Sequence, residues 1–374
     1  PLLCGLLLAA CGQRAARPIG DFTLPVYTPR YASGFEITGA AGSRSTLVTV
    51  HNPWYGDEVT DQYLFIARDG EPAPAGFEGQ VLRDETRRVV CMSGSYIAML
   101  DALGAADRVV GVSGAQYLIN ETLRRRIARG EAADVGFDSN VDFERLMALR
   151  PDLVMLFGIG GADTALTGKL RELGIPYLYM GEHCEESPLG KSEWVVVAAE
   201  IAGLRTEGSR LFAAIPERYE RLRALAQQTA ARPRVMLNTP YRDTWFMPAR
   251  NSYMVRLLED AGARYVFEEN TATQTLPIDI EQAYYLTSKS DFWLNVSGCN
   301  TLDEVRRQNP RLADTPPVRE GRVYDNNRRR NAAGGSDFWE SGVLRPDRVL
   351  ADLVHIFHPE LSETDELYYY RQLE

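Results

Sequence analysis

The sequence predicts an α/β protein with two Rossmann-like lobes, each built on a parallel sheet and joined to the other by a long α-helix. The main observation is an internal repeat, because residues 93–105 and 250–263 both place Ser-Tyr at a helix start and Gly-Ala at its end. Residues 142–158 and 279–298 then share an Asp-x-Glu helix followed by an apolar strand that begins with Asp and ends with Gly. A chain of 374 residues has room for two such lobes, and a cleft between lobes is where small ligands bind.

The first lobe is expected to begin with a β-rich segment at residues 35–80, in which residues 45–51 and 61–68 are extended. Short apolar runs then alternate with amphipathic helical segments, which is the pattern of a parallel sheet with βαβ crossovers. The expected strands are 88–92, 108–112, 153–157 and 176–180, and the expected helices are 95–103, 122–129, 142–149 and 162–173.

The alternation stops between the lobes, where two segments have a helical period and no strand separates them. They are residues 192–202 and 207–228, and Pro216 is expected to kink or interrupt the second one. A helix resists bending more than extended strands do, so the connection is expected to be a stiff hinge.

The domain boundaries follow from these segments. The second lobe is expected to run from a strand at 234–238 to a helix at 346–357, which His358-Pro359 ends. The expected division is a signal peptide and tether at 1–22, an N-terminal lobe with its β-rich lead-in at 23–186, a helical linker at 187–231 and a C-terminal lobe at 232–374.

Composition and charge are those of a globular protein and argue against some partners. Hydrophobic residues make up 45% of the chain and charged residues 25%. The net charge of −10 argues against a nucleic-acid partner, whose phosphates require a basic surface. Beyond the N-terminus, no apolar run reaches the about 20 residues that a transmembrane helix needs.

The N-terminus carries the pattern of a processing signal. Residues 1–10 are apolar and small, and Leu8-Ala-Ala-Cys11-Gly resembles the lipobox of bacterial lipoproteins, in which a peptidase cuts before the Cys and its sulfur is lipidated. The resemblance implies that Cys11 is the lipidated N-terminus and that residues 13–20 form a polar tether. We therefore expect a periplasmic or extracytoplasmic protein that a lipid anchors to a membrane without spanning it.

The remaining cysteines and the histidines do not form a metal site. Cys184 and Cys299 lie in expected loops without Cys-x-x-Cys spacing, so free thiols are expected, with a Cys184–Cys299 bridge as the alternative. Of only four histidines, His355 and His358 are one helical turn apart, and a structural or capping role at the helix end is favoured for them. We expect no metal site and no cofactor.

Five phrases, in this order, resemble the substrate-binding proteins of ABC importers that deliver iron–siderophore, haem or cobalamin. Three of them are residues 88–96, 103–112 and 149–155. The other two, residues 187–194 and 334–342, resemble a subgroup of these proteins.

One departure concerns the loop after the first strand. The family often has Ser-Pro-Ser where this chain has Ser93-Gly94-Ser95. We expect the change to alter the ligand-facing loop and not the fold.

The resemblance implies a monomeric, non-enzymatic protein that captures a metal chelate between its lobes and delivers it to a membrane permease. Family ligands are flat or bulky chelates, held by aromatic faces and, when the chelate is anionic, by cationic side chains. Residues at the carboxyl ends of parallel strands and in the first turn of the next helix face such a cleft. The candidate ligand-binding residues are Tyr96, Tyr117, Trp245, Tyr253, Arg328, Arg329 and Trp339.

Acidic residues after equivalent strands are candidates for docking on the permease. In the family, one acidic residue on each lobe contacts arginines of the two permease subunits, which implies roles for Asp163 and for Asp303 or Glu304. The alternative for these carboxylates is to stabilise a helix N-terminus.

Other classes of function remain as alternatives. An enzyme or a metallocluster-handling protein of the same architecture requires clustered Cys and His ligands or a nucleophile–base pair, and the sequence offers neither. A protein for bare metal ions requires at least three converging ligands. Gly190-Lys191-Ser192 ends like a phosphate-binding loop, but it lacks the first glycine and a preceding strand.

Overall fold

The structure is a computed structural model. Cys11 and Asp163 lie outside the residues that it describes, so the lipidation and the first docking position stay predictions. The described residues are 16–55, 60–158, 161, 164–242, 244–272, 274–362 and 366–374.

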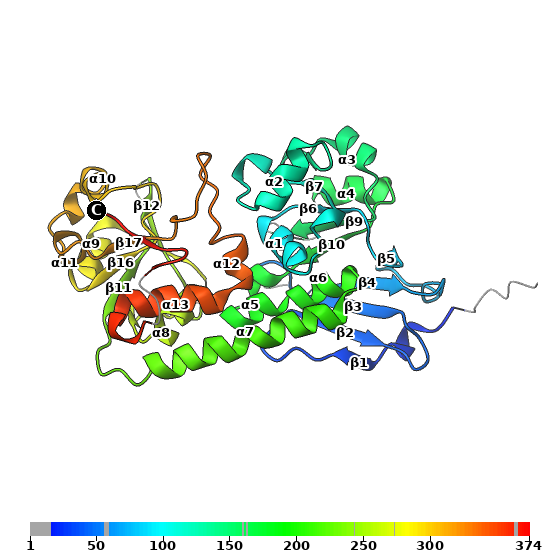
Figure 1. The fold of residues 1–374 in the computed structure, drawn as a ribbon, viewed down its shortest axis with the longest axis horizontal. Coiled ribbons are helices and arrows are strands. Elements are labelled where there is room, and N and C mark those ends of the chain that lie inside the picture. The colour runs from blue at the N-terminus through cyan, green and yellow to red at the C-terminus, as the bar shows by residue number, and fades with distance from the viewer. Residues whose placement is uncertain are drawn as a thin grey trace, which may run out of the picture.

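An N-terminal sheet precedes the first lobe, where the sequence predicts a β-rich segment. Its order is β1-β2-β3-β4-β5, and all neighbours are antiparallel except the parallel pair β4–β5. Figure 1 shows this sheet below the first lobe, beside the end of the long green helix that lies away from the second lobe. The strands are β1 (Leu24–Tyr27), β2 (Phe35–Gly39), β3 (Thr46–His51), β4 (Asp61–Ala67) and β5 (Gln80–Arg83).

The first lobe has the parallel sheet that the sequence predicts, in the order β10-β9-β6-β7-β8. Each expected strand and helix is present within a few residues of its predicted bounds. The strands are β6 (Val89–Cys91), β7 (Val109–Val112), β8 (Ala133–Asp134), β9 (Leu153–Phe157) and β10 (Tyr177–Met180). The helices are α1 (Gly94–Ala102), α2 (Glu121–Ala128), α3 (Phe143–Leu149) and α4 (Ala165–Glu172).

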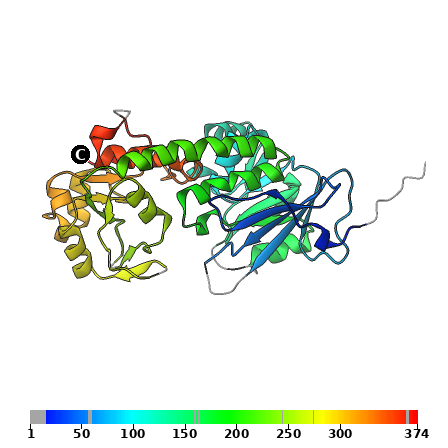
Figure 2. The same cartoon turned by 90° about the horizontal axis from the view of Figure 1, so that it is seen from below.

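Helix α7 (Arg205–Ala226) is the long connection between the lobes, and it continues through Pro216, which does not interrupt it as expected. It packs against α6 (Val195–Ile201), which precedes it in the chain, and against α13 (Pro346–Phe357) of the second lobe. Arg218 and Tyr219 fix it to the second lobe through Asp347 (2.7 Å) and Asp260 (2.7 Å). Figure 2 shows α7 running along both lobes. The two helices before it are α5 (Pro188–Glu193) and α6 (Val195–Ile201).

The second lobe has a five-stranded sheet in the order β14-β11-β16-β17-β18, which is parallel except for the last strand, and a small antiparallel sheet β12-β13-β15. Helix α13 spans the predicted residues 346–357. The strands are β11 (Arg234–Leu237), β12 (Pro240–Tyr241), β13 (Thr244–Met247), β14 (Arg264–Tyr265), β15 (Leu276–Ile278), β16 (Phe292–Leu294), β17 (Val323–Asp325) and β18 (Arg371–Gln372). The helices are α8 (Tyr253–Asp260), α9 (Ile280–Ser288), α10 (Leu302–Gln308), α11 (Pro316–Arg319), α12 (Ser341–Leu344) and α13 (Pro346–Phe357).

The sequence repeat has the same structural meaning in both lobes. Asp142 and Asp279 each cap a helix by accepting a hydrogen bond from the third residue that follows, at 2.9 and 2.8 Å. Asp152 and Asp291 each directly precede a strand, and each accepts a backbone N–H at the start of the neighbouring strand, from Arg88 or Arg234, at 2.8 Å. Because the repeated residues form the same helix caps and strand contacts in both lobes, the repeat reflects the common fold of the two lobes.

Two buried carboxylates attach the N-terminal sheet to the helices that follow the first lobe. Glu193, which is fully buried, accepts hydrogen bonds from the Tyr27 hydroxyl and from three consecutive backbone N–H groups at residues 30–32, all within 2.7–2.9 Å. Glu185 accepts the N–H groups of residues 33 and 34 and the indole N–H of Trp194. The sheet is therefore tied to the body of the first lobe by charge-assisted hydrogen bonds.

The part of the chain that the structure describes has no helix long and apolar enough to cross a membrane. Its three cysteines are free, so the alternative of a Cys184–Cys299 bridge is wrong.

Candidate functional site

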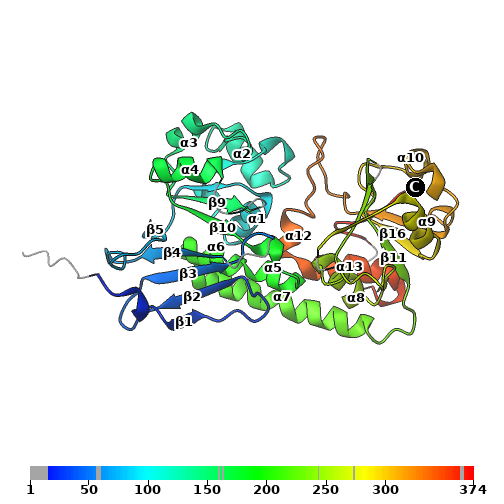
Figure 3. The same cartoon turned by 180° about the vertical axis from the view of Figure 1, so that it is seen from behind.

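The carboxyl ends of the parallel strands in the two lobes face each other. Strand β7 leads into residues 113–120, and β17 leads into residues 326–340. These two segments touch, because the side-chain amide of Asn331 donates hydrogen bonds to the carbonyl oxygens of Gln116 (2.8 Å) and Leu118 (3.1 Å). In α/β folds this edge of the sheet is where ligands bind. Figure 3 shows the second segment between the lobes from behind.

Large aromatic side chains are exposed at these facing edges. Tyr117 and Phe137 of the first lobe are 43% and 44% exposed, and their ring centroids are 6.2 Å apart. Trp339, in the segment after β17, is 55% exposed. Tyr241 and Phe246, in the hairpin that follows β11, are 66% and 41% exposed. Exposed aromatic rings on two facing edges are a surface for stacking a flat ligand.

Two of the sequence-predicted residues, Tyr117 and Trp339, are therefore exposed at this junction. The two predicted arginines are also exposed, but each is paired. Arg328 lies 3.4 Å from a carboxylate oxygen of Glu366, and Arg329 donates to Asp337 at 2.8 Å. Their contact with a ligand stays a prediction.

Tyr96 and Trp245 are buried, at 0% and 1% exposed, so neither ring is presented at this junction, and their contact with a ligand stays a prediction. Tyr96 lies on the inward side of α1, and its hydroxyl donates to the carbonyl oxygen of Leu156 at 3.2 Å. The indole N–H of Trp245 donates to the carbonyl oxygen of Leu237 at 2.9 Å, and its ring packs against Trp293. Successive side chains of a strand point to opposite faces, so the next residue, Phe246, is the exposed one.

Trp245 also lines a pocket of about 340 Å³ with Arg242, Ile280 and residues 308–312. This pocket lies on the face of β13 opposite to Phe246.

Tyr253, the counterpart of Tyr96 in the repeat, lies where the lobes meet. The ammonium of Lys191 is 4.6 Å from the centroid of its ring, and Lys191 is 7% exposed. Both side chains line a pocket of only about 10 Å³, together with Phe338 and Val343 of the second lobe. Burial raises the pKa of Tyr253 and lowers that of Lys191. The junction is closed by packing here, and a ligand contact of Tyr253 stays a prediction.

The sequence reasoning missed the polar residues that follow β10. One carboxylate oxygen of Glu182, which is buried, accepts the Ser95 hydroxyl at 3.0 Å, and the other has no hydrogen-bond partner among the described residues. His183 makes a 2.7 Å contact with the carbonyl oxygen of Gly158. Burial lowers the pKa of His183, but the interactions with Cys184 and Glu182 outweigh it and raise the pKa to about 9.

The only sequence signal for these residues is their place directly after a predicted strand. Tyr55, which was also missed, is 65% exposed and donates its hydroxyl to the carbonyl oxygen of His183 at 2.7 Å. In the described part of the chain, no three His, Cys, Asp or Glu side chains are grouped so as to hold a metal ion.

The second docking position is described, and its two acids differ. Asp303 is 81% exposed in its side chain and pairs with Arg306 at 2.9 Å, one turn later in α10. Glu304 folds back onto the backbone N–H of Asn300, and its own N–H donates to the Thr301 hydroxyl at 3.2 Å. Glu304 therefore stabilises the N-terminus of α10, which is the alternative to docking that the sequence leaves open for these acids. Asp303 is the acid that projects outward.

Two lobes on parallel sheets, facing each other at their carboxyl edges and joined by a long helix, define the class of two-lobed binding proteins. A family model described as "Periplasmic binding protein" matches residues 89–328, and the chain belongs to this family. The N-terminal sheet lies before the matched residues.

Curated relatives include two uncharacterized lipoproteins of Methanocaldococcus jannaschii. One is 25% identical over 332 residues, covering 83% of this chain and 77% of the relative. The other is 22% identical over 330 residues, covering 84% and 81%. Both are named as lipoproteins, as the lipobox resemblance leads us to expect for this chain.

Solved structures share the fold. A periplasmic haem-binding protein from Pseudomonas aeruginosa has a TM-score of 0.59 and 19% identity, covering 77% of this chain and 98% of that chain. A protein described as an ABC-type Fe³⁺-hydroxamate transport system, from Saccharomonospora viridis, has a TM-score of 0.54 and 17% identity, covering 73% and 94%. The sequence-based prediction of the family and of the two-lobed α/β fold is confirmed.

Proposed function

We propose that this protein is a lipid-anchored, substrate-binding component of an ABC importer that captures a flat metal chelate between its lobes. The observation that carries the proposal is the set of exposed aromatic residues on the facing carboxyl edges of both lobes, Tyr117 and Phe137 on one side and Tyr241, Phe246 and Trp339 on the other. Side chains this apolar are exposed together where a partner covers them.

The chemistry of this surface favours a planar, anionic chelate over a bare ion. Aromatic rings stack favourably on a flat π-system. Arg328 and Arg329 lie in the same segment as Trp339, where their guanidinium groups can bind the carboxylates of an anionic chelate. A bare ion requires several converging ligands. The names of the haem-binding and Fe³⁺-hydroxamate structural neighbours support the same class of ligand.

The other parts of the proposal concern organisation and delivery. We divide the chain into the tether at 1–22, the N-terminal lobe at 23–186, the helical linker at 187–231 and the C-terminal lobe at 232–374. The protein acts as a monomer without catalysis, held at the membrane through lipidated Cys11. It delivers its cargo by docking one acidic residue per lobe, Asp163 and Asp303, on the permease.

The experiment is a ligand panel on the full-length protein purified in detergent. Haem, cobalamin and a ferric hydroxamate siderophore are titrated separately, and binding is followed by visible absorbance and by quenching of Trp fluorescence. Fe³⁺ and Zn²⁺ salts serve as bare-ion controls. Saturable binding of one chelate supports the proposal. Binding of bare ions alone, or turnover of a chelate into a new product, overturns it.

A further inference from the structure

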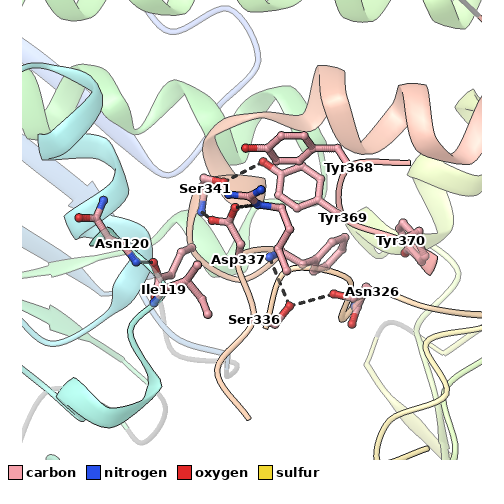
Figure 4. A network of polar contacts seen from close by, with 12 residues as sticks. Ile119, Asn120, Asn326, Ser336, Asp337, Ser341, Tyr368, Tyr369 and Tyr370 are labelled. Carbon is pink, nitrogen blue, oxygen red and sulfur yellow. Dashed lines mark hydrogen bonds and ion pairs between the residues drawn. The ribbon is translucent and has the colours of Figure 1, made fainter. Parts of the chain in front are cut away.

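The segment after β17 forms a short hairpin of fixed shape, which we call the arm (residues 326–340). Arg330 and Ser336 pair in an antiparallel bridge, and the N–H of Asn331 donates to the carbonyl oxygen of Gly335 at 3.0 Å. At its base, Asp337 accepts the guanidinium of Arg329, and its own N–H donates back to the carbonyl oxygen of Arg329 at 2.9 Å. Figure 1 shows the arm rising between the two lobes, and Figure 4 shows the contacts at its base.

The arm belongs to the second lobe but bonds to the first. Glu340 accepts the backbone N–H of Ile119 on one carboxylate oxygen (2.6 Å) and that of Asn120 on the other (2.8 Å). Asn120 is the N-cap of α2 and Ile119 precedes it, so the carboxylate lies at the start of this helix, where a negative charge is favourable. Together with the Asn331 amide, four hydrogen bonds join the arm to residues 116–120.

Two glycines make these contacts sterically possible. A Cβ atom on Gly94 would lie 2.6 Å from Cγ of Glu340, and a Cβ atom on Gly335 would lie 1.7 Å from the carbonyl oxygen of Tyr117. Any larger residue at Gly94 must displace the Glu340 side chain. This contact explains the departure in the Ser93-Gly94-Ser95 loop, since Pro at the middle position would occupy the space of Glu340.

We propose that the arm is a clasp that ties the second lobe to the first on the ligand-facing side, and that Glu340 is its main positioning residue. This inference does not depend on the proposed cargo. Tyr117 precedes the clasped residues 118–120, and Trp339 precedes Glu340, so the clasp also fixes two exposed aromatic side chains of the candidate site relative to each other. A surface organised before binding loses less entropy when a ligand arrives.

Charged groups of both lobes surround Glu340. Glu340 is 6% exposed, and this burial, together with the nearby Asp337, raises its pKa from 4.5 to about 7. The Ile119 and Asn120 N–H groups and Arg124 of α2 act in the opposite direction and lower the pKa. On the first lobe, Asp101 of α1 also faces the site through the side-chain amide of Asn120. The N–H groups of Ile119 and Asn120 donate to both oxygens of the carboxylate, so these hydrogen bonds favour its charged form.

The first experiment measures hydrogen exchange of the Ile119 and Asn120 amides in the ligand-free, full-length protein. Glu340→Ala should speed exchange at both amides about 10- to 100-fold, from the usual strength of hydrogen bonds to a carboxylate. Glu268→Gln, at an exposed position of the same lobe, is the matched control and should change nothing there. Unchanged exchange in a folded Glu340→Ala protein overturns the clasp.

A double-mutant cycle tests the steric claim and does not rely on one variant. Gly94→Ala should speed exchange at Ile119 and Asn120 in the wild-type background and have no further effect in Glu340→Ala, because the displaced side chain is gone. Additive effects of the two substitutions overturn the role of Gly94.

Lobe separation is then measured by spin–spin distances between one label on each lobe. Glu340→Ala should show a wider distribution than the wild type, because the hydrogen bonds to Ile119 and Asn120 are lost. A Glu340→Ala distribution as narrow as that of the wild type overturns the clasp.

Discussion

Glu193 is one of the two carboxylates that attach the N-terminal sheet, and Glu193→Gln tests its contribution. Glu193 accepts four hydrogen bonds: from the Tyr27 hydroxyl and the Arg30 N–H on one oxygen, and from the Tyr31 and Ala32 N–H groups on the other. Glutamine has the same shape but replaces one oxygen by an NH₂ group, which cannot accept. Whichever way the amide turns, two of the four donors lose their acceptor.

The magnitude follows from these contacts. Hydrogen bonds to a charged group contribute about 1.5–3 kcal/mol each, so two of them amount to about 3–6 kcal/mol. The loop at residues 28–34 can detach in the variant, so that its N–H groups bond to water instead. The expected loss of unfolding free energy is therefore at the lower end of this range, about 3 kcal/mol. Such a loss is a large part of the about 5–15 kcal/mol that stabilises a typical domain.

The assay is urea denaturation of the full-length protein, with limited proteolysis as a local readout. Glu193→Gln should lower the unfolding midpoint and make the residue 28–34 loop a new cleavage site. Glu172→Gln, whose carboxylate is 67% exposed on α4, is the control and should change stability by no more than about 0.5 kcal/mol. If Glu193→Gln keeps both the wild-type midpoint and the wild-type cleavage pattern, the carboxylate does not hold the sheet.

The remaining predictions concern the anchor, the ligand and delivery. Cys11→Ala should abolish metabolic labelling by a fatty-acid analogue, and equal labelling would exclude lipidation at that sulfur. Tyr117→Ala and Trp339→Ala should each weaken chelate binding by about 1–3 kcal/mol in fluorescence titrations. Tyr96→Phe should bind normally, and a loss there equal to that of Tyr117→Ala would contradict the site. Asp303→Lys should keep ligand affinity and reduce uptake by cells, because it places like charges against the permease; wild-type uptake would leave Asp303 without a docking role.

The fold was predictable because the signals that specify it are local. Asp142 and Asp279 cap helices from their own sequence neighbourhood, and Asp152 and Asp291 mark where strands begin. These roles require only the order of residues along the chain. Apolar residues at helical spacing were sufficient to place α13 at its observed bounds.

The site was predicted less well because the exposure of a side chain depends on which face of its strand or helix packs against the neighbouring elements. Trp245 and Phe246 are adjacent in a four-residue strand, and the sequence does not say which of them faces the core until the pairing with β15 is known. Tyr96 and Tyr253 hold the same place in the repeat, but Tyr96 is enclosed and Tyr253 lies under Lys191 at the junction. The repeat fixes their helices and not what packs on them.

The two phrases that resemble a subgroup acquire a common physical meaning in the structure. Residues 187–194 contain Glu193, which holds the backbone of residues 30–32, and residues 334–342 contain Glu340, which holds the backbone of residues 119–120. In both phrases a buried carboxylate collects N–H groups from a segment far away in sequence. Hydrophobic contacts allow many equivalent side chains, but a carboxylate that serves several donors has no substitute of the same shape. Such residues are therefore the sequence positions that specify an added sheet or an interlobe arm, and Glu185 and Asn331 add further hydrogen bonds to the same two attachments.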